Sequence, residues 1–246
     1  MSLALPEGDG PLRHERLRTA RLYFCCEARP RGEDPELLLR AALSGGVDIV
    51  QLREKELGRA EIERSAATFR RVCDIYSALF IVNDDPDMAR ACDADGVHVG
   101  QDDATAEGAR ELLGPDAIIG LSTHSEEQIA AAAERPVDYI SVGPIWETPT
   151  KAGRAAVGLE LVSHAAERAT LPFFGIGGVD PSNAEQVVLA GARRLCAVRA
   201  IRDAADPEAA AAELRRAFAA AEGAPRGSQD MLLDEPAPWR GVAPGG

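Results

Sequence analysis

The segment "FIVNDDPDMARACDADGVHVGQDD" (residues 80–103) contains two short apolar runs, and clustered acidic residues follow both of them. The first run, residues 80–82, leads into "NDD" (83–85), and the second, residues 97–99, leads into "GQDD" (100–103). Nearly continuous apolar runs of this length are typical of strands that are buried on both faces of a parallel sheet. The segment therefore predicts two successive buried strands with polar carboxyl ends.

The same alternation extends over most of the chain. Between the apolar runs lie helical patterns such as "PELLLRAALSGG" (35–46) and "SNAEQVVLAGA" (182–192), which end at or near glycine. Eight strand–helix pairs predict a single (β/α)₈ TIM barrel over residues 20–221, with a doubly wound open sheet as the alternative, because periodicity does not establish closure. The predicted strands are residues 21–25, 47–52, 79–82, 96–99, 117–121, 138–143, 172–177 and 194–198.

The composition excludes several classes of protein. The chain has 246 residues, 46% of them hydrophobic, which is enough for one such barrel, and a formal net charge of −13. That charge argues against a nucleic-acid surface. No apolar segment approaches the roughly 20 residues of a membrane span, and the first residues lack the apolar core of a signal peptide. Five cysteines without C-x-x-C spacing predict buried free thiols in a cytoplasmic protein.

The two ends differ from the patterned region. Residues 1–19 are polar with proline and glycine, and residues 222–246 are rich in proline and glycine without apolar periodicity. Segments of this kind bury too little apolar surface to fold by themselves. We therefore predict flexible tails at both ends.

Polar residues follow nearly every predicted strand, where a (β/α)₈ barrel builds its active site. This placement makes them candidates for catalysis or binding. The candidates are Gln51, Arg53, Glu54, Lys55, Asn83, Asp84, Asp103, Ser122, Thr148, Thr150, Lys151, Gly177, Gly178, Val198 and Arg199.

Carboxylates from two neighbouring predicted strands suit a hard divalent cation. Mg²⁺ typically takes one or two carboxylates and completes its shell with water and phosphate oxygens. Asp84 and Asp103 are therefore candidate Mg²⁺ ligands, with Arg53 and Lys55 placed to contact a bridging phosphate. In the alternative interpretation the acids only cap helices, which describes Asp85 well because proline follows it.

A second anion site is predicted on the opposite side of the barrel mouth. Gly177 and Gly178 follow the seventh strand, where this fold commonly binds phosphate, although the pattern lacks the third glycine of a dinucleotide fingerprint. Thr148, Thr150 and Lys151 supply hydroxyls and an ammonium nearby, and a solvated turn is the alternative there. The two sites together predict two phosphorylated small-molecule substrates.

Six motifs occur along residues 21–221: "QLREK" (51–55), "VNDD" (82–85), "ADGVHVGQDD" (94–103), "GLSTH" (120–124), "VGPIWETPTK" (142–151) and "FGIGGVD" (174–180). Their combination and order closely resemble the thiamine-phosphate synthase family. The resemblance implies a barrel transferase that joins 4-amino-2-methyl-5-hydroxymethylpyrimidine diphosphate to 4-methyl-5-hydroxyethylthiazole phosphate. The products would be thiamine phosphate and pyrophosphate.

The resemblance also implies roles for the candidate residues. Asp84 and Asp103 would hold Mg²⁺. Contacts to the pyrimidine diphosphate would come from Gln51, Arg53, Glu54, Lys55, Asn83, Ser122 and Lys151, of which Arg53, Lys55, Ser122 and Lys151 would act in catalysis. Contacts to the thiazole phosphate would come from Thr148, Thr150, Gly177, Gly178, Val198 and Arg199.

Some alternatives stay open at the level of sequence. Many relatives carry a small hydroxyl residue at the position of Arg199, whose side chain either contacts the thiazole phosphate or points to solvent. A thiazole tautomerase-like isomerase would use His124 and no metal pair, although "THSEEQ" (123–128) also reads as the start of a helix with Ser125 and Gln128 at capping-box spacing. A Schiff-base aldolase would use Lys151. A non-catalytic module would bind thiazole phosphate without turnover.

Overall fold

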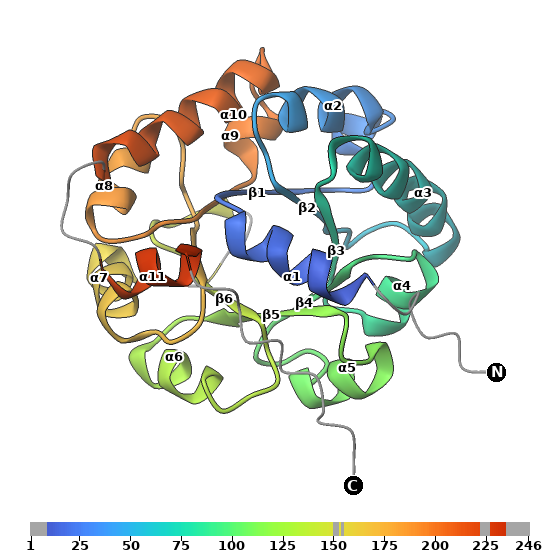
Figure 1. Ribbon diagram of the computed structural model, residues 1–246. Coiled ribbons are helices and arrows are strands. Elements are labelled where there is room, and N and C mark those ends of the chain that lie inside the picture. The colour runs from blue at the N-terminus through green and yellow to red at the C-terminus, as the bar shows by residue number, and fades with distance from the viewer. Residues whose placement is uncertain (1–8, 150–152, 154, 222–226, 235–246) are drawn as a thin grey trace, which may run out of the picture.

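Eight parallel strands close into a barrel in the order β1 to β8, and β8 pairs with β1 (Figure 1). The computed structural model describes residues 9–149, 153, 155–221 and 227–234. Closure confirms the (β/α)₈ barrel and excludes the open sheet. The strands are β1 (Leu22–Cys26), β2 (Ile49–Leu52), β3 (Leu79–Asn83), β4 (Gly96–Val99), β5 (Ile118–Thr123), β6 (Tyr139–Val142), β7 (Phe173–Ile176) and β8 (Leu195–Ala197).

Helices surround the barrel and cover its outer face (Figure 1). In the part of the chain that the structure describes, no helix is long and apolar enough to cross a bilayer. The surrounding helices are α2 (Glu36–Ser44), α3 (Arg59–Tyr76), α4 (Pro86–Ala91), α5 (Ala106–Leu113), α6 (Glu126–Ala132), α7 (Gly158–Arg168), α8 (Ala184–Leu189) and α10 (Pro207–Arg216). Shorter elements are α9 (Arg199–Arg202) and the 3₁₀ helices η1 (Pro30–Gly32) and η3 (Ala217–Ala221).

Side-chain caps set the starts of four helices. Asp85, Thr105, Ser125 and Asp206 each accept a hydrogen bond, of 2.9 to 3.3 Å, from the backbone N–H three residues further along. Such caps satisfy N–H groups that the first helical turn leaves without partners. The cap role predicted for Asp85 is confirmed, and the cap of α5 is Thr105 rather than an acid of the preceding cluster.

Two apolar layers follow from the alternation of side chains along each strand. The larger layer lies between the strands and the helices and includes Phe24, Phe80 and Phe173. The smaller layer fills the barrel interior and includes Tyr139 and Phe174. Because successive side chains of a strand point to opposite faces, each buried strand contributes to both layers.

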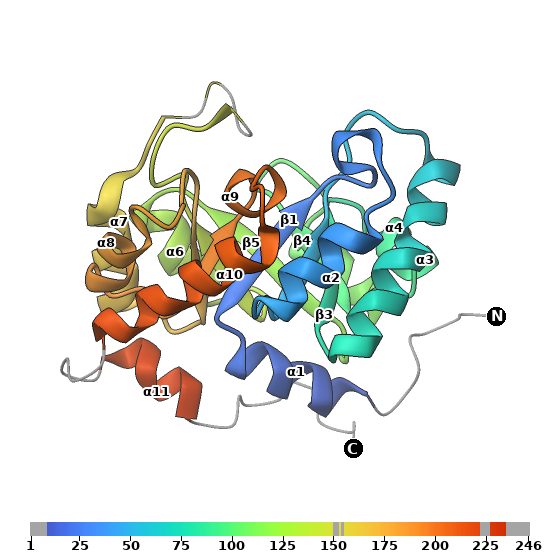
Figure 2. The same ribbon diagram turned by 90° about the horizontal axis from the view of Figure 1, so that it is seen from above.

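The structure differs from the sequence prediction at both ends. Residues 10–19, predicted as part of a flexible tail, form α1 (Gly10–Thr19), and residues 228–234 form α11 (Ser228–Asp234). Both helices lie at the end of the barrel opposite α9 (Figure 2). The physical reason is that α1 buries Leu17 against the barrel interior, while Gln229 of α11 is 2% exposed and donates to the carbonyl of Leu171 at 3.2 Å.

A buried carboxylate ties α1 to the barrel. One oxygen of Asp95 accepts from Arg13 Nε at 2.9 Å, and the other accepts from Phe80 N at 2.8 Å and Arg70 Nη1 at 3.0 Å. Asp95 precedes β4 and is 4% exposed. This one side chain therefore joins α1, α3 and two strands.

We expect Asp95→Ala to lower the free energy of unfolding by about 3–5 kcal/mol, because it leaves two guanidinium groups and a backbone N–H without their buried partner. The matched control is Glu63→Ala, which removes the solvent-exposed pair with Arg59 on α3 and should cost less than about 1 kcal/mol. Urea unfolding of both variants measures the difference. Equal destabilisation would contradict the role given to Asp95.

Candidate active site

A cavity of about 760 Å³ opens at the carboxyl ends of the strands. Twelve of the fifteen candidate residues line it, although they come from seven different strands and the loops that follow them. These twelve are Gln51, Arg53, Lys55, Asn83, Asp84, Asp103, Ser122, Thr148, Gly177, Gly178, Val198 and Arg199. Strand closure thus brings the two predicted anion regions into one cavity.

Three candidates are not placed in this cavity. Thr150 and Lys151 lie outside the residues that the structure describes. Glu54 turns back into its own loop, where its carboxylate accepts from the backbone N–H groups of Lys55 and Glu56 at 2.8 Å and of Ala28 at 3.3 Å. Burial opposes the ionised form of Glu54, but these N–H donors outweigh it and lower the pKa. The geometry therefore assigns Glu54 to shaping the loop that carries Arg53 and Lys55.

The acid cluster after β3 has an uncommon backbone conformation. Asp84 has a φ of 65°, in the left-handed region, and its N–H donates to the carbonyl of His98 at 2.8 Å. Non-glycine residues rarely adopt this conformation, although Asp and Asn tolerate it best. In this position the Asp84 carboxylate faces the cavity and accepts a hydrogen bond from Lys55 Nζ.

The second acid lies across the same part of the cavity, on the loop after β4. Asp103 Oδ2 accepts from Gly100 N at 3.0 Å, and no hydrogen bond from the described residues reaches the other carboxylate oxygen. Within the described residues, no three His, Cys, Asp or Glu side chains converge on one metal position. Two carboxylates with free oxygen positions beside an open cavity fit Mg²⁺, which completes its octahedron with water and substrate oxygens.

Glycines after β7 allow two loops to pack closely. Gly177 and Gly178 have φ values of 100° and 71°. A Cβ atom on Gly177 would lie 2.4 Å from Pro144 Cα, and one on Gly178 would lie 2.8 Å from Trp146 Cβ. Trp146 N donates to the carbonyl of Gly177 at 3.0 Å. Both glycines are therefore required for the fit between the β6 and β7 loops, and they also expose backbone to the cavity.

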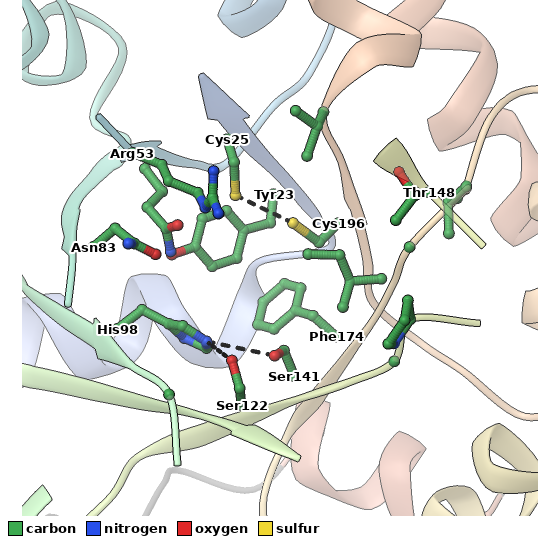
Figure 3. Close-up of a pocket in the computed structure, with 18 of the residues that line it drawn as sticks. Tyr23, Cys25, Arg53, Asn83, His98, Ser122, Ser141, Thr148, Phe174 and Cys196 are labelled. Carbon is green, nitrogen blue, oxygen red and sulfur yellow. Dashed lines mark hydrogen bonds between the residues drawn. The ribbon is translucent and has the colours of Figure 1, made fainter. Parts of the chain in front are cut away.

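A chain of buried hydrogen bonds, which sequence reasoning missed, crosses the barrel interior at the floor of the cavity, and Figure 3 shows its last link, from His98 to Ser122. Gln51 Nε2 donates to the Tyr23 hydroxyl at 2.8 Å, and the Tyr23 hydroxyl lies 3.0 Å from the Tyr139 hydroxyl. The Tyr139 hydroxyl lies 3.0 Å from His98 Nδ1, and His98 Nε2 lies 3.0 Å from Ser122 Oγ. The chain joins two candidate residues, Gln51 and Ser122, from opposite sides of the barrel.

Burial and aromatic packing act on the two tyrosines of this chain. Burial raises the pKa of both Tyr23 and Tyr139 well above the ordinary tyrosine value. Phe174 packs edge-on against both rings, with centroids 5.3 and 5.5 Å away. The available sequence signal was the polar residue inside an apolar strand, as in "GVHV" (96–99), where period-two alternation places His98 inside the barrel.

His124 and Arg199 also lie at the cavity. His124 Nδ1 contacts the carbonyl of Gly143, and the backbone N–H of His124 donates to Gln128 Oε1 at 2.7 Å. The predicted helix start at Ser125 is confirmed. Arg199 is the first residue of α9 and is exposed. Its guanidinium therefore has access to both the cavity and the solvent.

Comparison with known proteins decides the family. The family model described as thiamine monophosphate synthase matches residues 22–201, which span all eight strands. The chain belongs to this family. Members of the thiamine monophosphate synthase family are transferases.

Relatives in this family match the chain over almost their whole length. A thiamine-phosphate synthase from Acidothermus cellulolyticus is 50% identical over 207 residues, covering 83% of this chain and 98% of that protein. One from Mycobacterium tuberculosis is 48% identical over 220 residues, covering 85% and 99%. The solved thiamine phosphate pyrophosphorylase from Pyrococcus furiosus has a TM-score of 0.75 and 32% identity, covering 85% of this chain and 98% of that one.

The two adjacent acids after β3 differ in role, and stability measurements can separate them. We expect Asp85→Ala to lower the free energy of unfolding by about 1 kcal/mol, because the hydrogen bond from Met88 N that begins α4 is lost. Asp85→Asn retains an accepting oxygen and should restore most of the stability. Thermal and urea unfolding measure both variants, and unchanged stability of Asp85→Ala would refute the cap.

Proposed function

We propose that this chain is a thiamine-phosphate synthase that joins 4-amino-2-methyl-5-hydroxymethylpyrimidine diphosphate to 4-methyl-5-hydroxyethylthiazole phosphate and releases pyrophosphate. One observation carries the proposal. A single cavity contains both the acid and base cluster of β2 to β4 and the glycine loop of β7, as a reaction between two phosphorylated substrates requires. The relatives are thiamine-phosphate synthases, which supports the synthase over the tautomerase and the non-catalytic module.

The diphosphate would bind on the side of β2 to β4. Arg53 and Lys55 supply positive charge there, and Asn83 supplies an amide that can donate to a phosphate oxygen. Gln51 gives one amide hydrogen to Tyr23, so its carbonyl oxygen is held for a donor on the pyrimidine. The buried chain behind Gln51 fixes this orientation before substrate arrives, which lowers the cost of binding.

We assign Mg²⁺ to Asp84 and Asp103. When bound, the cation would neutralise the negative charge that develops on the departing pyrophosphate. Lys55, which pairs with Asp84, would add a second positive charge at the same place. Both groups act on charge that grows during the reaction, and this is where electrostatic stabilisation raises the rate.

The thiazole phosphate would bind on the opposite side, against the loops after β6, β7 and β8. Gly177 and Gly178 expose backbone there, Thr148 adds a hydroxyl, and Arg199 beside Val198 adds a positive charge. Thr150 and Lys151 follow Thr148 closely in the sequence. The family resemblance gives Thr150 a contact to the same phosphate and Lys151 a contact to the diphosphate. This arrangement would hold the thiazole nitrogen toward the pyrimidine across the cavity.

The reaction would exchange one bond for another at the pyrimidine methylene carbon. The bond from this carbon to the pyrophosphate oxygen breaks, and both electrons leave with the oxygen. The carbon becomes carbocation-like, and the lone pair of the thiazole nitrogen forms the new C–N bond. Arg53, Lys55, Ser122 and Lys151 would bind the diphosphate as its charge increases.

We also place the enzyme in the cytoplasm. All five cysteines are buried free thiols, and biosynthesis from phosphorylated intermediates fits that compartment. The net charge of −13 argues against a nucleic-acid surface, so we propose small molecules as the partners.

We expect the purified chain to release pyrophosphate only when both substrates and Mg²⁺ are present, with thiamine phosphate formed in equal amount. A coupled pyrophosphate assay with product analysis by mass spectrometry measures both. Omission of each substrate, and of Mg²⁺ by chelation, provides the controls. Pyrophosphate release without the thiazole phosphate, or no turnover under any of these conditions, would refute the proposal.

We expect Asp84→Asn and Asp103→Asn to lower turnover by about two to three orders of magnitude. Each variant loses a charged metal ligand whose contribution to transition-state stabilisation is several kcal/mol, and each 1.4 kcal/mol corresponds to about tenfold in rate. Asparagine is chosen for two reasons. At position 84 it tolerates the left-handed backbone, and at position 103 it keeps an oxygen that accepts from Gly100 N. Raising the Mg²⁺ concentration should partly restore both variants, because excess ligand offsets weakened binding.

The control for this experiment is Asp85→Asn at the neighbouring cap residue, which should turn over normally at the Mg²⁺ concentration that suffices for the unmodified chain. Initial rates against Mg²⁺ concentration, with thermal melting alongside, measure all three variants. Normal rates in the Asp84 and Asp103 variants would show that neither acid binds the metal.

A further inference from the structure

Two of the five cysteines face the cavity. Cys25 on β1 and Cys196 on β8 are each 3% exposed and line the cavity wall, with their sulfur atoms 3.5 Å apart (Figure 3). The other three thiols, Cys26, Cys73 and Cys92, pack in the apolar layer between strands and helices. The pair is therefore in contact with the space that ligands enter, and the other thiols are not part of that wall.

Barrel closure brings the two sulfurs together, because β1 and β8 are the first and last strands. Tyr23 pairs with Cys196 in the parallel register, so Cys25 lies two residues further along its strand. A strand spacing of about 4.8 Å and an advance of about 6.6 Å separate the two Cα atoms by roughly 8 Å. This exceeds the limit of about 7 Å beyond which a disulfide requires backbone movement. A direct bond therefore requires backbone movement, whereas two metal–thiolate bonds of about 2.3 Å each can join sulfur atoms that lie 3.5 Å apart.

We propose that Cys25 and Cys196 form a two-thiolate binding site for Cu(I). Thiolates are soft ligands that select Cu(I), whereas a structural zinc site needs four closed ligands. Among the described residues, no third His, Cys, Asp or Glu completes such a set. On binding, each thiol loses its proton to solvent and each sulfur forms one bond to copper, which stays in the +1 state.

The position of the site makes it inhibitory. Cys25 pairs with Gln51 of β2, and Cys196 pairs with Ile176 of β7, directly before Gly177. An ion held by the two sulfurs lies between the strands that carry the two proposed substrate regions. Bound Cu(I) therefore competes with substrates. This consequence rests on the proposed synthase activity, whereas metal binding itself does not.

Anaerobic titration of the full chain with Cu(I), against a chromogenic Cu(I) chelator, tests the binding. We expect one Cu(I) per chain by native mass spectrometry, and loss of this stoichiometric binding in both Cys25→Ser and Cys196→Ser. Cys26→Ser is the matched control, since its thiol is adjacent in sequence but lies on the other face of β1, and it should bind one Cu(I). Retained binding in both serine variants of the pair, or equal loss in Cys26→Ser, would overturn the site.

Pyrophosphate release provides the second readout. Cu(I) should inhibit the wild-type chain and Cys26→Ser, the chelator should reverse the inhibition, and Cys196→Ser should resist it. Copper binding at the pair without inhibition would overturn the competition with substrates. A chain that binds Cu(I) but never releases pyrophosphate would instead count against the synthase activity. A Cys25–Cys196 disulfide formed in the folded chain by peroxide would overturn the geometric argument for a bridging ion.

Discussion

Closure of eight parallel strands is the constraint on which the rest of this structure depends. Because every strand runs in the same direction, all carboxyl ends meet at one rim, and residues more than a hundred positions apart line one cavity. Closure also forces alternate side chains of every strand into a narrow interior. The β1–β8 contact completes this arrangement and brings Cys25 beside Cys196.

The interior is filled in two different ways along the barrel axis. Apolar side chains such as Ile49, Leu79 and Ile118 occupy part of it, and the polar chain from Gln51 to Ser122 occupies the part at the floor of the cavity. A buried polar group is costly unless it is hydrogen-bonded, so the chain is stable only as a connected unit. This connection fixes side chains at two sides of the proposed active site with one network.

The opposite end of the barrel is closed by charge as well as by apolar contact. Arg194 is fully buried, donates from Nη2 to the carbonyl of Arg18 at 3.1 Å near the end of α1, and burial lowers its pKa to about 9. Arg13 and Asp95 form a second buried contact between α1 and the barrel. The proposed site at the mouth can therefore keep charged groups open to solvent, because stability is supplied by the packed layers and by this end.

The sequence by itself determined eight alternating strands and helices, because continuous apolar runs between helical patterns have few other solutions, while closure of the sheet was decided by the structure. The sequence also determined most of the rim, because polar residues directly after parallel strands must lie at the carboxyl ends. It also predicted the cap at Asp85, which depends on residues close in sequence. Tertiary structure alone decided the rest: that α1 closes the barrel, that Glu54 turns into its own loop, that His98 joins Tyr23 and Tyr139, and that two of five thiols meet at the cavity. Each of these depends on contacts between distant strands, whose register and inward-facing positions follow from closure and leave no local pattern in the chain.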